Sequence, residues 1–420
     1  MCYSVPMILR ARTLLPVTLP PIEDGAVGVS EQRILAVGRW KDLRRQFAGA
    51  TTDLGEVLLL PGLVNAHCHL DYTDMAGQLA PPKLFPDWIK GLLALKTHWS
   101  YSDYAQSWLR GAQMLLGHGV TTVADIEAVP ELLPDVWAAT PLRVHSYLEM
   151  TGVKSRRPAR QVLQAAIDKI ESLPAAQGSP GLSPHAPYST TPELLRLSAK
   201  AARKKRWRLT MHVAESEPEF DMFQSRRGPL FAWLKNQRDM ADCGHGSPVQ
   251  HLDKHWLLSD RLLAVHVNYL GLHDAALLGQ RKVSVAHCPR SHRYFQHQPF
   301  PRRELMASGV NVCLGTDSLA SVRKERGEPL ELNLFAEMRA FAEANPGSPP
   351  ASILQMATIN GAHALGLEGK IGELSPGAQA DLIALPFSGR LSQAYEAVLR
   401  HAGPVPRVMI GGRWVVGQAP

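Results

Sequence analysis

Two histidines separated by one residue, His67 and His69, follow an apolar run that begins at Val57. In a β-strand, residues two apart point to the same face, so both imidazoles can approach one point while Cys68 points away. Two imidazoles in this arrangement can bind one transition metal ion. A chain with 17 histidines also produces such a pair by chance. The pair alone therefore leaves a metal site and a chance pairing equally open.

Further polar side chains follow other apolar, β-branched runs at the point where each run ends. His185, His212, His266 and Asp317 all occupy such positions, and Glu215 comes three residues after His212. Barrel enzymes place their active sites at the carboxyl ends of their strands. The agreement of several strand ends favours a metal site over chance.

The elements that must position these residues alternate short strands with longer amphipathic helices, which predicts an α/β fold with a parallel sheet. The predicted strands are 57–66, 121–126, 142–148, 181–185, 209–213, 262–267, 282–287 and 310–315. Helical patterns cover 86–99, 104–117, 159–173 and 192–206. This number of strands indicates a TIM-like (β/α)8 barrel over residues 57–369.

The two ends of the chain have a different pattern from the middle. Residues 1–56 and 370–420 carry short alternating strands and turns, with too few helices for βα units. We expect both termini to join in one small β-sandwich domain beside the barrel.

Net charge, cysteine content and the length of apolar runs indicate the cellular compartment and argue against nucleic-acid and membrane partners. The 420 residues carry a net charge of +7 that is spread along the chain, and the most basic cluster, 200–208, is typical of an exposed helix end. Five cysteines without a CxxC pattern favour reduced thiols. No apolar run is long enough for a membrane span and no leader pattern begins the chain. We expect a cytoplasmic protein without nucleic-acid or membrane partners.

Several motifs resemble one family along nearly the whole chain. They are PGLVNAHCH, SPHAPYS, MHVAES, VHVNYL, AHCPRSH, GTDSLAS and INGAHALGLEGKIGELSPGAQADLIAL. These are similar to the amidohydrolase superfamily, in its cytosine/guanine/adenosylhomocysteine deaminase and triazine hydrolase branch. The resemblance implies a metal-dependent hydrolase barrel, and dimers are common among such relatives. Carried over by position, it implies the metal ligands His67, His69, His212 and Asp317, the proton shuttle Glu215, and His266 as the residue that orients and helps to activate water.

The donor types agree with these implied roles. Three imidazoles and one carboxylate leave a divalent metal ion a free position, where the pKa of a water molecule falls towards ~7. A nearby carboxylic acid can then protonate a ring nitrogen and the leaving amine. Binuclear relatives use a carboxylated lysine after the fourth strand, but no lysine occurs between Lys169 and Lys200. We therefore expect one ion, Zn²⁺ or Fe²⁺.

Other segments bear on the substrate, which we expect to be a small heterocyclic amine. The run HCPRSHRYFQHQPFP, GTDSLAS and an acid after the third strand resemble aminodeoxyfutalosine deaminases. This implies hydrolytic deamination of an exocyclic amine on a purine-like ring, and the ring implied is the adenine of 6-aminodeoxyfutalosine, an intermediate of menaquinone biosynthesis. Arg290, Arg293 or Arg156 would meet the carboxylate of that substrate by a bidentate pair. The predicted substrate contacts are His185, Glu149, Trp88, Arg290 and Ser318.

Two departures from the pattern of the family bear on the substrate, and the first weakens the assignment to methylthioadenosine or adenosylhomocysteine. Methylthioadenosine and adenosylhomocysteine deaminases carry a ribose-binding acid about ten residues after the tryptophan, whereas residues 95–98 here hold none. A charged stretch at 322–328 also follows GTDSLAS. The alternatives are deamination of adenosylhomocysteine, methylthioadenosine or guanine, hydrolysis of a triazine, and a non-catalytic barrel used as a scaffold. The last requires loss of a ligand position, and all four are present.

Overall fold

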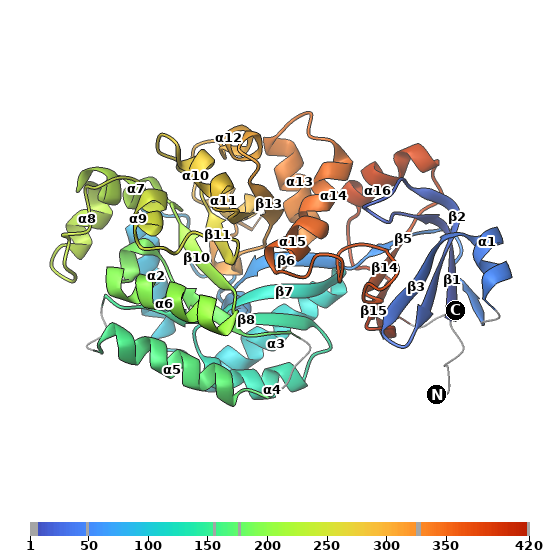
Figure 1. Ribbon diagram of the computed structural model, residues 1–420, viewed down its shortest axis with the longest axis horizontal. Coiled ribbons are helices and arrows are strands. Elements are labelled where there is room, and N and C mark those ends of the chain that lie inside the picture. The colour runs from blue at the N-terminus through green and yellow to red at the C-terminus, as the bar shows by residue number, and fades with distance from the viewer. Residues whose placement is uncertain (1–6, 48–49, 154–156, 175–177, 325–328, 418–420) are drawn as a thin grey trace.

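A computed structural model describes residues 7–47, 50–153, 157–174, 178–324 and 329–417 of the chain. Its strands form two separate sheets, a parallel one from the middle of the sequence and a mixed one from the two termini. The terminal sheet lies at one end of an elongated molecule, on the right in Figure 1.

The parallel sheet is the predicted barrel. Its eight strands follow the order β13-β12-β11-β10-β9-β8-β7-β6, and each pairs in parallel with its neighbour. They are β6 (Leu63–Cys68), β7 (Val120–Glu127), β8 (Arg143–Met150), β9 (Gly181–Pro184), β10 (Leu209–Val213), β11 (Leu262–His266), β12 (Ser284–His287) and β13 (Asn311–Leu314). The predicted fold class is confirmed.

Residues just after β13 close the barrel against β6. The backbone amides of Thr316 and Asp317 donate to the carbonyl oxygen of His67 at 2.9 and 3.1 Å. The Asn65 side chain donates to Thr316 Oγ1 at 2.8 Å and accepts from the Thr316 amide at 3.1 Å. Cys68 and Asp317 form a parallel bridge. These bonds define the barrel seam, which fixes the ends of the first and last strands relative to each other.

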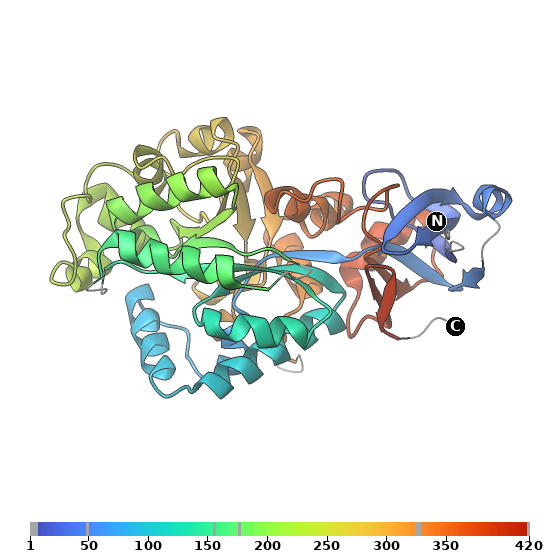
Figure 2. The same cartoon turned by 60° about the horizontal axis from the view of Figure 1, so that its bottom comes forward.

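Helices lie outside the strands, as Figure 2 shows. Between β6 and β10 they are α2 (Phe85–Lys96), α3 (Tyr101–Gly117), α4 (Leu133–Ala138), α5 (Ala159–Ser172) and α6 (Pro192–Lys205). Between β10 and β13 they are α7 (Glu217–Ser225), α8 (Gly228–Leu234), α9 (Pro248–Lys254), α10 (Asp274–Gln280), α11 (Pro289–Tyr294) and α12 (Arg302–Ala307). After β13 come α13 (Leu334–Ala344), α14 (Pro350–Met356) and α15 (Ile359–Ala364).

The local sequence explains where the predicted helices begin and end. Ser100 and Asp103 form a capping box at the start of α3, and Trp108, Ala112 and Leu115 form its buried face. Helix α6 ends one residue before its predicted limit, because Arg206 adopts a left-handed backbone that caps the helix.

The terminal sheet joins segments from both ends of the chain. It contains β1 (Met7–Leu14), β2 (Ile22–Ser30), β3 (Arg33–Arg39), β4 (Thr51–Asp53), β5 (Val57–Pro61), β14 (Leu382–Pro386), β15 (Arg407–Ile410) and β16 (Arg413–Val416). The order β16-β15-β14-β5-β1-β2-β3 is continuous, with β4 beside β1. Helix α1 (Trp40–Gln46) lies against β2 and β3, whereas α16 (Ala394–Arg400), between β14 and β15 in the sequence, packs on α13 and α14.

The single strand predicted at 57–66 is wrong, because the chain passes from one sheet to the other at Gly62. A side chain there would meet Thr121 at 2.2 Å, so glycine permits the close crossing. In β5, Leu58 and Leu60 pack in the barrel core, whereas Leu59 packs in the core of the terminal sheet. Strand pairing thus puts β5 with the terminal sheet, and the domain division at residues 56 and 370 stays a prediction.

Two further expectations concern thiols and membranes. Cys68, Cys243, Cys288 and Cys313 are buried and free, whereas Cys2 lies outside the described residues. Within the described ranges, the protein has no helix that is long and apolar enough to cross a membrane.

We predict that Gly315→Ala weakens the barrel seam. Its new methyl group would meet the Cβ, carbonyl oxygen and amide nitrogen of His67 at 2.8 to 2.9 Å. Overpacking of this kind costs about 1–3 kcal/mol, so the midpoint of denaturant unfolding and the bound metal per chain should both fall. The control is Gly117→Ala, where nothing lies within 4 Å. Equal unfolding midpoints and metal contents in the two variants would contradict the role of the seam.

Candidate active site

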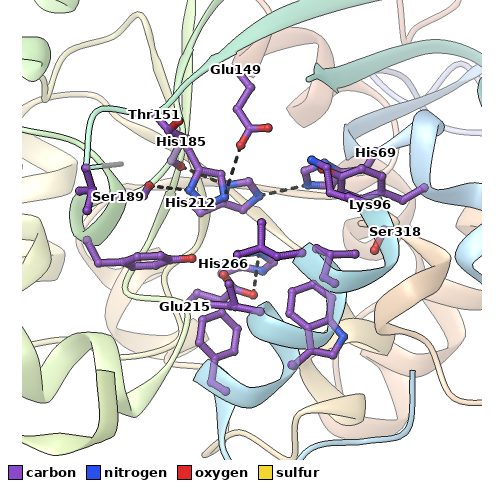
Figure 3. Close-up of a pocket in the computed structure, with 18 of the residues that line it drawn as sticks. His69, Lys96, Glu149, Thr151, His185, Ser189, His212, Glu215, His266 and Ser318 are labelled. Carbon is purple, nitrogen blue, oxygen red and sulfur yellow. Dashed lines mark hydrogen bonds and ion pairs between the residues drawn. The ribbon is translucent and has the colours of Figure 1, made fainter. Parts of the chain in front are cut away.

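The predicted metal ligands and the two residues predicted to act on water and protons meet at the carboxyl ends of the barrel strands. All of them are buried, and each belongs to a strand end or to the loop that follows it. They are His67 in β6, His69 after β6, His212 in β10, Glu215 after β10, His266 at the end of β11 and Asp317 after β13. Figure 3 shows His69, His212, Glu215 and His266 directed into one pocket.

Potential metal ligands form two overlapping groups that share His67. In each group, the ligand atoms lie within 4.8 Å of one another, and the groups are His67, His69 and His212, and His67, His266 and Asp317. Nε2 of His69 is 3.2 Å from Nε2 of His212. Oδ1 of Asp317 is 3.5 Å from Nε2 of His67 and 3.7 Å from Nε2 of His69.

His67 carries the strongest indication that a cation belongs here. Its side chain is 1% exposed, yet neither ring nitrogen has a hydrogen-bond partner. Buried polar atoms are rarely left unpaired, because desolvation without a partner costs free energy. A metal ion between His67 and its neighbours would give Nε2 of His67 a partner, so the donor set fits a divalent cation.

Burial keeps the imidazoles in the neutral form that binds metal ions. Desolvation and the neighbouring His67 lower the pKa of His69 well below its usual range. Desolvation and His185 do the same for the pKa of His212. Desolvation lowers the pKa of His266 to about 3. These rings are therefore neutral at neutral pH, each with one ring nitrogen free to accept.

Hydroxyl groups orient the carboxylate of Asp317. Ser291 Oγ and Ser321 Oγ donate to its Oδ2 at 2.6 and 3.0 Å. Oδ1 is the oxygen that faces His67 and His69. The two bonds hold the Asp317 carboxylate in one orientation, as hydrogen bonds to a metal-binding carboxylate do.

Strained backbone occurs at three of the strand ends. Ala214, His266, Val267 and Asp317 have φ angles of 48°, 72°, 49° and 54°, in the left-handed region. This conformation is uncommon for residues other than glycine, above all for the β-branched valine, and it clusters at functional sites. The bends turn His266 and Asp317 towards the pocket at positions where a regular strand would continue.

Glu215 is a buried acid, and the side chains of Glu219 and Asn268 hold its backbone in place. Desolvation, followed by the charges of Asp317 and Glu219, raises the pKa of Glu215 well above its usual range. Its Oε1 lies 3.6 Å from Nε2 of His266. The amides of Ala214 and Glu215 donate to the Glu219 carboxylate at 3.1 and 2.9 Å. Asn268 Nδ2 donates to the Glu215 carbonyl oxygen at 2.9 Å.

A cavity of about 210 Å³ opens onto these residues. One part of its lining is apolar and consists of Tyr72, Phe85, Trp88, Ile89, Leu92, Leu93, Val153, Tyr188, Trp233 and Leu234. The other part is polar and consists of Lys96, Glu149, Thr151, His185, Ser189 and Ser318 together with site residues named above. This combination suits a flat aromatic ligand with a few polar groups.

Four of the five predicted substrate contacts line this cavity. His185 Nδ1 is 2.6 Å from Ser189 Oγ, and its Nε2 is 3.7 Å from Glu149 Oε1. Trp88 Nε1 donates to the carbonyl oxygen of Ala320 at 3.3 Å, and Ser318 also lies on the wall.

The predicted contact Arg290 is elsewhere. Its Nη1 donates to the carbonyl oxygen of Glu331 at 2.9 Å and lies 3.7 Å from the buried carboxylate of Glu337. Arg290 and Arg293 line a separate small cavity, because α11 directs them away from the barrel mouth. Arg156 and residues 325–328 of the charged stretch lie outside the described residues.

Sequence reasoning missed several residues that shape the site. Glu219 is fully buried although Glu217, two residues before it, is exposed, and nothing in the local sequence distinguishes the two acids. Ser291 and Ser321 bind Asp317 from motifs that were noted only for resemblance. Lys96 was overlooked, although its spacing of eight residues from Trp88 on a helix puts both on one face.

Comparison with known proteins gives consistent matches. A model described as "Amidohydrolase family" matches residues 58–415. The chain is 32% identical over 383 residues to the 5-methylthioadenosine/S-adenosylhomocysteine deaminase of Syntrophobacter fumaroxidans, with 87% of this chain and 80% of the relative covered. It is 29% identical over 357 residues to the aminodeoxyfutalosine deaminase of Deinococcus radiodurans, with 81% of each covered.

Solved structures agree with these matches. An adenosine deaminase from Xanthomonas campestris with bound zinc has a TM-score of 0.83 and 25% identity, and the match covers 98% of this chain and 93% of that chain. The family model spans most of the sequence and includes every strand of the barrel. The chain therefore belongs to the amidohydrolase family, which confirms the resemblance and the hydrolytic class of enzyme expected from its motifs.

Proposed function

We propose that this enzyme removes the exocyclic amino group of an adenine nucleoside by hydrolysis, with 6-aminodeoxyfutalosine as the preferred substrate. The observation that carries the proposal is the buried Glu215 carboxyl group, 3.6 Å from His266 and beside a cluster of metal-ligand side chains. The names of both sequence relatives, which denote deaminases of adenine nucleosides, support the same reaction.

The metal would be held by His67, His69, His212 and Asp317, whose ligand atoms converge. We propose one divalent ion, Zn²⁺ or Fe²⁺. When bound, the ion supplies a Lewis acid that lowers the pKa of a coordinated water towards ~7.

The protein's own groups then move protons. Neutral His266 can accept a hydrogen bond from the attacking water through Nε2, which has no hydrogen-bond partner in the protein. Glu215, protonated because burial raises its pKa, can donate to the ring nitrogen next to the amino-bearing carbon. It can then pass a proton from the attacking water to the leaving amine. The water oxygen replaces nitrogen on that carbon and ammonia leaves, without oxidation or reduction.

The cavity lining supports a purine ring as the reacting group. Phe85, Trp88 and Trp233 offer aromatic faces, and His185 and Glu149 offer polar contacts. Adenosylhomocysteine and methylthioadenosine are the second candidates because relatives carry those names. Guanine and triazines are the remaining candidate substrates. The cytoplasmic location, the homodimer, and the absence of nucleic-acid and membrane partners stay predictions.

The test is ammonia release by the metal-loaded enzyme from 6-aminodeoxyfutalosine, adenosylhomocysteine, methylthioadenosine, adenosine, guanine and melamine. We expect the highest kcat/KM for 6-aminodeoxyfutalosine. Preference for guanine or melamine would overturn the assignment to adenine nucleosides, and preference for methylthioadenosine would change the substrate within that class.

We predict that Glu215→Gln lowers kcat by about 100- to 10,000-fold, the usual contribution of a general acid–base group. The amide keeps the size of the side chain but cannot transfer the proton. Metal content and thermal midpoint should equal those of Glu217→Gln, an exposed neighbour that serves as control. Wild-type turnover in the Glu215 variant would exclude it as the shuttle.

We predict that Asp317→Ala binds less metal, because the substitution removes the only carboxylate of the proposed ligand set. Metal per chain should be measured after dialysis against a weak chelator, together with the unfolding midpoint. Asp42→Ala, at an exposed position of α1, is the control. A metal content equal to that of the control would remove Asp317 from the ligand set.

A further inference from the structure

One basic side chain lines the active-site cavity. Among the described residues of the lining, Lys96 is the sole lysine or arginine. It stands at the end of α2, and the spacing of four residues puts it on one helix face with Trp88 and Leu92, which also line the cavity. Figure 3 shows Lys96 beside His69 and near Ser318, while Glu149 points towards His185.

The ammonium group of Lys96 is held by a phenol. Its Nζ donates to Tyr72 Oη at 2.5 Å and lies 4.8 Å from the centre of the Tyr72 ring. That ring stacks on His69, with 5.2 Å between ring centres and 3° between planes. The contacts fix Lys96 next to the metal-ligand cluster, because Tyr72 is itself buried.

No carboxylate among the described residues forms an ion pair with Lys96, whose one described polar partner is Tyr72. The buried Asp71 makes no hydrogen bond to Lys96 or to any other described residue. The cavity therefore contains a basic side chain that has neither a hydrogen bond nor an ion pair to a carboxylate of the described residues.

We propose that Lys96 binds an anionic group of the substrate, a carboxylate, and thereby selects adenine nucleosides that carry a negative charge. This inference rests on the proposed deamination of an adenine nucleoside. A half-buried ammonium without a counter-ion gains a charge-assisted hydrogen bond when a carboxylate enters. Such a bond contributes about 10- to 100-fold to affinity.

Lys96 takes the role expected of an arginine from the sequence. Arg290 donates a hydrogen bond to the Glu331 carbonyl oxygen and lies beside the Glu337 carboxylate, and it does not line the cavity. A neutral nucleoside gains nothing from the charge of Lys96 beyond hydrogen bonds to its hydroxyl groups. Selection between charged and neutral substrates therefore distinguishes recognition of a carboxylate from recognition of a ribose.

The experiment compares 6-aminodeoxyfutalosine with its methyl ester, which differ in one charge. We expect wild-type enzyme to favour the carboxylate by at least about 10-fold in kcat/KM, mainly through KM, and the preference to shrink as salt increases. Lys96→Met should lower kcat/KM for the carboxylate about 10- to 100-fold more than for the ester. Lys96→Arg should recover part of this loss.

A second readout does not depend on turnover. Calorimetry with the deaminated carboxylate product should give weaker binding to Lys96→Met than to wild type, at unchanged metal content. The control is Lys200→Met, which removes the same charge from an exposed position of α6 away from the cavity. The control should retain the wild-type preference.

The outcomes separate the two proposals. Efficient deamination of both substrates, with equal losses in Lys96→Met, would overturn the carboxylate site and leave the deaminase function in place. Absence of turnover on both, with product binding that depends on Lys96, would overturn the function and retain the anion site. Absence of both turnover and binding would overturn both.

Discussion

The backbone hydrogen bonds between His67 and the segment Thr316–Asp317 are the constraint on which the active site depends. They close a parallel barrel, and they also bring together two proposed metal ligands, His67 and Asp317, that are far apart in the sequence. The register of β10 and β11 adds two more site residues, because His212 pairs with Val265 and Val213 pairs with His266. Donors at or just after the carboxyl ends of four strands thus converge. The strained φ angles at His266 and Asp317 are the local cost of this convergence.

Burial acts on the two kinds of titratable group in opposite directions, and both directions suit the proposed chemistry. It disfavours the charged form of every group, so the imidazoles stay neutral while the carboxyl group of Glu215 keeps its proton. Neutral imidazoles are ligands and proton acceptors, and a protonated carboxyl group is a proton donor. One physical effect therefore prepares a metal site and a general acid within the same cavity.

Much of this arrangement follows from the sequence because strand periodicity is a local property. His67, Cys68 and His69 alternate along one run, and the other site residues end runs of apolar residues, so their meeting follows from parallel strands. The break at Gly62 could not be predicted from hydrophobicity, because apolar residues flank it on both sides, in β5 and at the start of β6, although the two strands belong to different sheets. Long-range partners such as Ser291 with Asp317, and the direction of Arg290, depend on how helix α11 packs. The role of Lys96 could not be predicted from the sequence either, because it depends on which carboxylates surround the lysine in the folded chain.

The most direct test of the account is X-ray absorption spectroscopy at the metal edge of the enzyme loaded with one equivalent of Zn²⁺. Because burial holds imidazoles neutral beside one oriented carboxylate, the account predicts scattering from three imidazole rings and from oxygen ligands, without sulfur. Distances to nitrogen and oxygen should be about 2.0–2.2 Å. The same signal should lose imidazole scattering when His212 is replaced by alanine. A spectrum with sulfur ligands, or with an unchanged imidazole count in that variant, would contradict the convergence of strand ends on one metal.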